Sequence, residues 1–178
     1  NPLVSALCRE GTQRTGRSLR RAVFDGGDYP AREDMSLTSL IGGLALANAG
    51  LGAVHGFAAP LGGMFHAPHG AICGRLLPAV MQVNFDALQD REPGHPALMR
   101  YQEIAILLTG DTAALPQEGI EWVNETCSML EVPGLSTYGI TADDFPAIIE
   151  KARQANSMKA NPVLLSDAEL TRILQMSL

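Results

Sequence analysis

Apolar residues along this chain recur at helical rather than strand spacing. Over residues 3–22 they form one stripe among polar and basic positions, with Leu3, Leu7 and Leu19 as representatives, which predicts a helix with one buried face. Stretches in which Val, Ile or Thr alternate with polar residues are scarce, and aromatic residues make up only 5% of the chain. The pattern therefore predicts an all-α fold, a multi-helix domain of about seven or eight helices.

Segments rich in Gly and Pro predict where these helices end. Residues 24–30 break the first helix, and Pro30 then suits the first turn of the next one. A shorter break at residues 65–68 precedes a helix expected over 69–85, and residues 91–96 read as a surface loop. Later helices are expected at about 97–109, 116–131 and 142–156.

Two capping boxes mark helix starts near the C-terminus. Ser166 with Glu169 predicts the beginning of the last helix, and Thr141 with Asp144 resembles the same device one helix earlier. No repeat, low-complexity tract or linker is visible, so residues 1–178 are expected to form a single helical domain.

Residues 35–65 contain no Lys, Arg, Asp or Glu, and this uncharged run is long enough to cross a bilayer. The run nevertheless holds seven glycines together with Asn48, His55 and Pro60, which add little apolar transfer energy. No Lys/Arg asymmetry marks an inside loop. We therefore expect a helix near the domain centre, covered on all sides by other helices, rather than a membrane segment.

Charge and cysteine usage narrow the class of protein. The formal net charge of −6 argues against nucleic acid or an anionic membrane as a partner, because both need a basic face. The three cysteines, Cys8, Cys73 and Cys127, lie far apart without a CxxC pair, which predicts reduced thiols that pack between helices. No signal peptide follows Asn1, so a cytoplasmic location is expected.

Three of the four histidines, His55, His66 and His69, fall within fifteen residues. His69 lies at the N-terminal end of a predicted helix, where the helix dipole disfavours an imidazolium and so favours the neutral ring that a divalent metal needs. Two helices joined by a tight turn can aim His55 and His69 at one point. On spacing alone, however, the pair matches no local metal motif, and hydrogen-bonded structural histidines stay the simpler interpretation. GxSxG, Walker and HExxH motifs are absent.

The residues around these histidines resemble the signature of the iron-containing (group III) alcohol dehydrogenases. The matching segments are Asn48-Ala-Gly-Leu-Gly-Ala-Val-His55-Gly, Pro60-Leu-Gly-Gly, Ala67-Pro68-His69-Gly70 and Leu76-Leu77-Pro78. The likeness continues from the opening Asn1-Pro2-Leu3 through Val132-Pro133-Gly134-Leu135 to the closing Asn161-Pro162, and so covers nearly the whole chain. It implies the helical C-terminal domain of such an enzyme, without the nucleotide-binding N-terminal domain.

The resemblance also implies residue roles. An Asp and three His hold Fe(II), sometimes replaced by Zn(II), in this family, and His55 and His69 occupy the positions of two of them. The metal polarises the oxygen of a small-molecule alcohol or aldehyde substrate while hydride passes to or from NAD or NADP. Asn48, Leu51 and Gly52 are expected to contact this cofactor, which is bound mainly by the N-terminal domain. Close helix packing is the alternative reason for the small residues here.

Two departures from the family pattern stand out. The remaining Asp and His ligands are expected before Asn1, and two protein ligands make no tight site, so this chain alone is expected to bind metal weakly and to lack dehydrogenase activity. Many relatives carry a proton-relaying His four residues after the first ligand, where this chain has Ala59. His66 is our candidate substitute, because it is near in sequence.

The expected partners are the substrate and the N-terminal domain of the same protein, and a second copy in a homo-oligomer is a further candidate. The alternative to an oxidoreductase domain is a helical scaffold or interaction module that has lost catalysis. Ala59 favours the scaffold, whereas the two retained histidines, His55 and His69, favour the enzyme.

Overall fold

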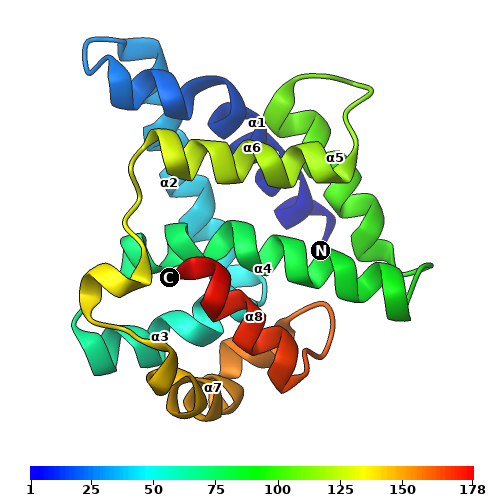
Figure 1. The fold of residues 1–178 in the computed structure, drawn as a ribbon. Coiled ribbons are helices and arrows are strands. Elements are labelled where there is room, and N and C mark those ends of the chain that lie inside the picture. Colours follow the sequence, from blue (N-terminus) through cyan, green and yellow to red (C-terminus); the bar gives the residue numbers. More distant parts are fainter. The chain divides into compact units, whose positions relative to one another are not determined.

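The computed structural model describes all 178 residues, and every regular element in it is a helix. Short 3-10 helices lie at Leu135–Tyr138 (η1), Ala142–Asp144 (η2) and Asn156–Ala160 (η3). The all-α fold of about eight helices is therefore confirmed. The α-helices, labelled in Figure 1, are α1 (Pro2–Phe24), α2 (Tyr29–Asn48), α3 (Ala53–Phe65), α4 (His69–Arg91), α5 (Pro96–Thr109), α6 (Pro116–Met129), α7 (Phe145–Gln154) and α8 (Asp167–Ser177).

Both predicted capping boxes are present. Before α8 the Ser166 hydroxyl accepts from the Glu169 N–H at 3.3 Å, while the Glu169 carboxylate accepts from the Ser166 N–H at 2.7 Å. Thr141 and Asp144 form the same arrangement at η2, directly before α7. These local side-chain bonds satisfy backbone donors that the first helical turn leaves unpaired.

The uncharged run at residues 35–65 differs from its prediction. It is not one covered helix, because residues 49–52 separate α2 from α3, and Ala49 is extended. Large apolar side chains of α2 lie open to solvent, with Leu40 60% and Leu46 52% exposed. The expectation of a central, fully covered helix was therefore wrong. No single helix has the length and apolar character to cross a membrane, although α2 and α3 taken together do so as a bent pair.

Contacts between residues divide the chain into two compact units. Unit 1 consists of residues 1–49 and 98–126, and unit 2 consists of residues 50–97 and 127–178. The expectation that residues 1–178 form a single domain stays a prediction.

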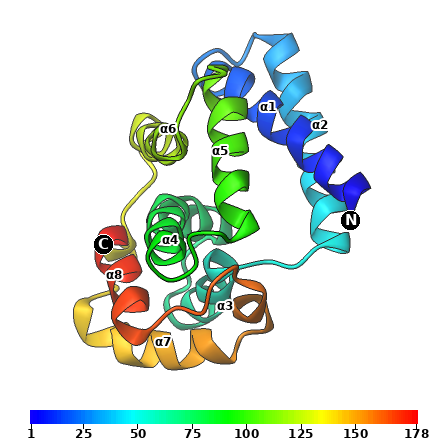
Figure 2. The ribbon, with the colours of Figure 1, turned by 90° about the vertical axis from the view of Figure 1, so that its right-hand side faces the viewer.

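Within unit 1, a buried carboxylate joins α1 to α2, which lie side by side in Figure 2. Asp34 of α2 is 8% exposed and accepts from Arg14 at 2.5 Å, from Arg17 at 2.7 Å and from the Ser18 hydroxyl at 2.5 Å. The donating Arg17 and Ser18 side chains hold the pKa of Asp34 well below its ordinary value of 3.8. Charge-assisted hydrogen bonds from three side chains of α1 thus tie α1 to α2.

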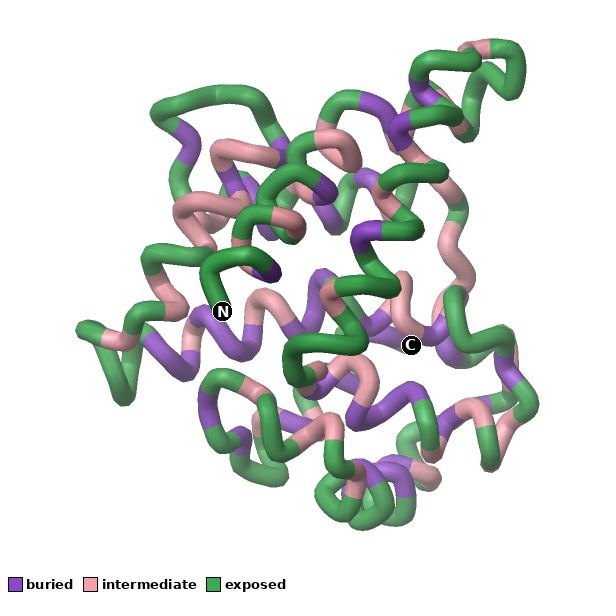
Figure 3. Tube along the Cα trace, turned by 180° about the vertical axis from the view of Figure 1, so that it is seen from behind, coloured by how far each residue is buried: buried purple, intermediate pink, exposed green.

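The core of unit 2 is built around α4, which packs against α3 and α8, while α3 also packs against α7. Figure 3 shows buried positions in purple, and they are frequent along α4. This core holds the inner faces of α3 and α4 against each other. Its fully buried side chains include Phe57, Leu61, Ile72, Leu76, Leu88, Ile148, Leu170, Ile173 and Leu174.

We expect Asp34→Asn to lower the free energy of unfolding at neutral pH by about 2 kcal/mol, less than for a fully buried pair because the Arg17 side chain is half exposed. Folding lowers the pKa of Asp34, so its stabilisation is complete above the ordinary value of 3.8 and is lost as the pH falls towards the folded value. Urea denaturation across this range should show wild type and variant converging in acid. The exposed Glu33→Gln is the control, and a pH-independent difference for Asp34→Asn would contradict this account.

Candidate metal centre

Three potential metal donors meet in unit 2. The ring nitrogens of His55 and His69 and the Sγ atom of Cys73 all lie within 4.8 Å of one another. The two imidazole centroids are 5.4 Å apart with their planes tilted by 52°, and Cys73 Sγ lies 3.5 Å from His69 Nε2. We call these three residues the His55–His69–Cys73 cluster.

Local structure explains how the cluster assembles. His55 is in the first turn of α3, and His69 is the first residue of α4, so the short break at residues 66–68 brings the two rings together. Cys73 follows His69 by four residues on α4, a spacing that places both side chains on one face of the helix. The inner faces of the same helices carry Phe57 and Ile72, which are fully buried and hold α3 and α4 in register.

A distant asparagine fixes the start of α3. Gly52, at the N-cap, offers no side chain, and Asn161 Oδ1 instead accepts from the Ala53 N–H at 3.1 Å. Asn161 also exchanges two bonds with the buried Asn84 of α4, at 3.1 and 2.7 Å, and donates to the Val163 carbonyl at 2.8 Å. Because Ala53 lies two residues before His55, this network fixes the position of the helical turn that carries the His55 imidazole.

The electrostatics of the cluster differ between its members. Burial lowers the pKa of the His55 imidazole, and repulsion from His69 lowers it further. A neutral His55 ring keeps a nitrogen lone pair available for a cation. Burial raises the pKa of the Cys73 thiol, so a cation must displace its proton in order to bind. His69 is exposed, which leaves one side of the cluster accessible to solvent.

The donor set fits a small divalent cation. Tetrahedral zinc with bonds of about 2.0–2.3 Å places neighbouring ligand atoms about 3.3–3.8 Å apart. The 3.5 Å between Cys73 Sγ and His69 Nε2 lies inside that window, and the 4.8 Å limit for the whole cluster requires small side-chain adjustments only. The structure thus brings His55 and His69 together, as the resemblance to the family implies, and their role as metal ligands stays a prediction.

Cys73 was missed at the level of sequence, where all three thiols were interpreted as packing residues. The available signal was the His69-x3-Cys73 spacing on a predicted helix, which puts two donors on one face. His66 lies outside the cluster. It is exposed and forms the C-cap of α3 with a φ of 52°, in the left-handed region. Its proton-relay role stays a prediction.

The glycines before and within α3 lie against another segment of unit 2. A Cβ atom at Gly52 would lie 3.1 Å from Asn161 Oδ1, and one at Gly56 would lie 2.8 Å from Met158 Cε. At Gly50 the added atom would meet Ala160 Cβ at 2.7 Å. Close packing against residues 158–161 therefore accounts for these small residues. The expected cofactor contacts of Leu51 and Gly52 stay predictions.

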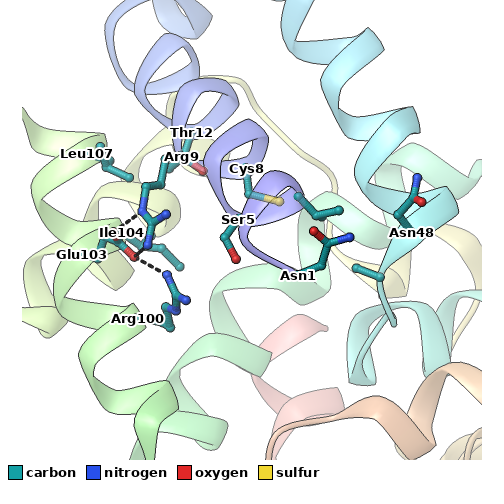
Figure 4. Close-up of a pocket in the computed structure, with 12 residues that line it drawn as sticks. Asn1, Ser5, Cys8, Arg9, Thr12, Asn48, Arg100, Glu103, Ile104 and Leu107 are labelled. Atoms are coloured by element: carbon teal, nitrogen blue, oxygen red, sulfur yellow. Dashed lines mark hydrogen bonds and ion pairs between the residues drawn. The ribbon is translucent and has the colours of Figure 1, made fainter.

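Asn48, the third expected cofactor contact, lies in unit 1. It ends α2, donates to the Leu44 carbonyl at 2.9 Å, and lines a pocket of about 430 Å³. Figure 4 shows Arg9 and Arg100 of this pocket both directed at Glu103, the Arg100 bond being 2.8 Å long. Both arginines of the pocket are thus paired with the single carboxylate of Glu103.

Residues 1–178 match the model of the Fe-containing alcohol dehydrogenase family, C-terminal. The chain therefore belongs to the iron-containing alcohol dehydrogenase family, and its fold is that of the family's C-terminal domain.

Individual relatives agree with this assignment. The chain is 31% identical over 176 residues to alcohol dehydrogenase 4 of Saccharomyces cerevisiae and 32% identical over 174 residues to 1,3-propanediol dehydrogenase of Klebsiella pneumoniae, covering 98% and 97% of this chain. A crystal structure of a 1,3-propanediol oxidoreductase superposes with a TM-score of 0.88 at 29% identity, over 100% of this chain and 46% of that one. The chain spans 44% of each of the first two relatives, less than half their length.

We expect Asn161→Ala to lower the free energy of unfolding by about 2–3 kcal/mol, because it strands the Ala53 N–H and the buried Asn84 amide. Thermal or urea denaturation measures the effect. Asn156→Ala is the matched control, since its exposed side chain accepts only from Lys159, and its cost should stay within about 0.5 kcal/mol. Equal losses in the two variants would show that Asn161 is an ordinary surface residue.

Proposed function

We propose that this chain is the C-terminal helical domain of a metal-dependent, NAD(P)-linked alcohol dehydrogenase that interconverts an alcohol and an aldehyde. It supplies part of the metal site, through His55 and His69, and part of the substrate pocket. The observation that supports this is the convergence of the two imidazoles from separate helices, within a chain whose whole length matches the family.

When bound, Fe(II) or Zn(II) supplies a Lewis acid that polarises the substrate oxygen during hydride transfer. The residues of this chain hold and orient that site. The lowered pKa of His55 keeps its ring neutral and able to donate a lone pair. His69, at the positive end of α4, is held in place by the helix and stays open on one side, where a small alcohol or aldehyde can approach.

The nicotinamide dinucleotide is bound mainly by the remainder of a longer protein. A dinucleotide fold of the common kind places its Gly-rich turn after a β-strand, and residues 1–178 contain helices only. One of the relatives described above, from Klebsiella pneumoniae, is named for 1,3-propanediol, a small primary alcohol. We propose a substrate of the same chemical class for the longer protein.

The purified 178-residue chain should show no reduction of NAD or NADP with short alcohols, with Fe(II) or Zn(II) present. In a protein that joins this chain to its nucleotide-binding domain, His55→Ala and His69→Ala should each lower kcat/KM by about 100-fold or more, since losing even an outer partner of a metal ligand costs about 10–100-fold. His95→Ala is the control, because His95 lies in the loop before α5 and accepts from the Ala97 N–H. Full activity of both cluster variants would exclude the proposed role.

For the proton relay we propose His66 in place of the missing histidine at Ala59. His66→Asn tests it, because asparagine also tolerates the left-handed backbone of this C-cap but does not titrate. In the two-domain enzyme we expect kcat to fall by about 100-fold and the limb of the pH–rate profile that reports the relay to disappear. An unchanged profile removes His66 from the mechanism.

The second candidate function is a helical scaffold without catalysis, which the exposed Ala59 at the relay position favours. A scaffold does not require either imidazole. Cation binding distinguishes the two candidates. If the wild-type chain binds a divalent cation and His55→Ala does not, the result supports the enzyme domain over the scaffold.

A further inference from the structure

We propose that Cys73 is a third cation donor of the His55–His69–Cys73 cluster, and that its thiolate makes the site prefer Zn(II) over Fe(II). The inference rests on the proposed metal role of His55 and His69 and adds a ligand to it. It also changes the expected strength of binding, because the expectation of a weak site assumed two donors from this chain.

The geometry singles out this thiol among the three. Cys73 Sγ is 3.5 Å from His69 Nε2, one turn along the same helix, and lies within 4.8 Å of the His55 ring nitrogen. Cys127, the other cysteine of unit 2, instead contacts the Gly74 carbonyl at 3.3 Å. Cys8 is exposed in unit 1 and lines the pocket there. Cys73 is therefore the one cysteine of the three whose sulfur lies close to both imidazole rings.

The surroundings of Cys73 favour a held ligand over a mobile one. Its neighbours Ile72 and Leu76 are fully buried in the core of unit 2, which fixes the rotation of α4 and so the direction of this face. Gly74 lies close to Val132, since a Cβ atom added at Gly74 would be 3.5 Å from the Val132 side chain. This contact also restrains the turn of α4 that carries Cys73. The Cys73 side chain itself is half-buried, between this core and the accessible side at His69.

The count and type of donors point to zinc. Zinc sites use three or four protein ligands of the Cys, His and carboxylate kinds, and residues 1–178 offer one Cys and two His, to which the resemblance adds an Asp and a His of the longer protein. Thiolate is a soft ligand that selects Zn(II), whereas Fe(II) stands low in the affinity order of divalent metals for nitrogen and sulfur sites. A cluster with Cys73 is thus better matched to Zn(II) than a set of imidazoles and carboxylates.

The competing explanation is a hydrogen bond from the Cys73 thiol to His69, which the same 3.5 Å separation permits. Such a bond orients the ring without touching a cation. Co(II) separates the two explanations, because a thiolate bound to cobalt gives a charge-transfer band in the near ultraviolet and a thiol that only donates a hydrogen bond gives none.

The experiment titrates the 178-residue chain with Co(II) and then displaces the cobalt with Zn(II). We expect the wild-type chain to show the thiolate band and Cys73→Ser to lose it, with Zn(II) affinity at least about tenfold weaker, the least that losing an outer partner costs. Cys127→Ser is the matched control and should keep both the band and the affinity. Far-UV circular dichroism confirms that each variant remains helical.

The variants also separate failure of this inference from failure of the proposed function. If His55→Ala and His69→Ala bind Co(II) as wild type does, the metal site itself is wrong. If those two variants lose binding while Cys73→Ser keeps the same Zn(II) affinity, Cys73 is a hydrogen-bond partner and the third donor is overturned. Cys73→Asp restores a third, harder ligand and should retain binding while reducing the Zn(II)-over-Fe(II) preference.

Discussion

The reciprocal hydrogen bonds between Asn84 and Asn161 are the interaction on which the candidate metal centre depends most. They join the middle of α4 to the segment after η3, and the same Asn161 oxygen accepts from Ala53 at the start of α3. The N-cap of α3 is Gly52, which has no side-chain oxygen that could accept from the free N–H groups of the first turn. Asn161 therefore both begins α3 and fixes its position against α4, which carries the other two members of the cluster.

Joined by these hydrogen bonds, α3 and α4 each pack one face into the core and carry the candidate metal donors on another face. Phe57 and Ile72 are buried on the inner faces of α3 and α4 and hold the two helices together. Side chains on the other faces are therefore positioned by this core without being part of it. His55 and His69 meet there, and Cys73 follows one turn later. The whole chain belongs to the iron-containing alcohol dehydrogenase family, and the metal role proposed for these residues rests on that membership together with their convergence.

The residues that bear on the proposed chemistry lie outside the core that packs α3 on α4. Ala59, where the resemblance implies a relay histidine, is exposed, and Cys73 lies beside the two imidazoles. Neither Ala59 nor Cys73 belongs to that buried core. The exposed apolar side chains of α2, among them Leu40 and Leu46, belong to unit 1.

The sequence alone determined what depends on neighbouring residues: most of the helices, the capping box at Ser166 and Glu169, and the short break that separates α3 from α4. Such features arise from hydrogen bonds and side-chain periodicity within a few residues, and a single chain displays them openly. The pairing of His55 with His69 needed the resemblance to a family, since fourteen residues separate them without a local motif.

Only the tertiary structure decided the rest. It showed that Asn161, 108 residues away, caps α3, that Cys73 joins the histidines, and that α2 is exposed although its composition suggested a covered helix. Burial and long-range hydrogen bonds depend on which surfaces meet, and no periodicity within one segment encodes that choice.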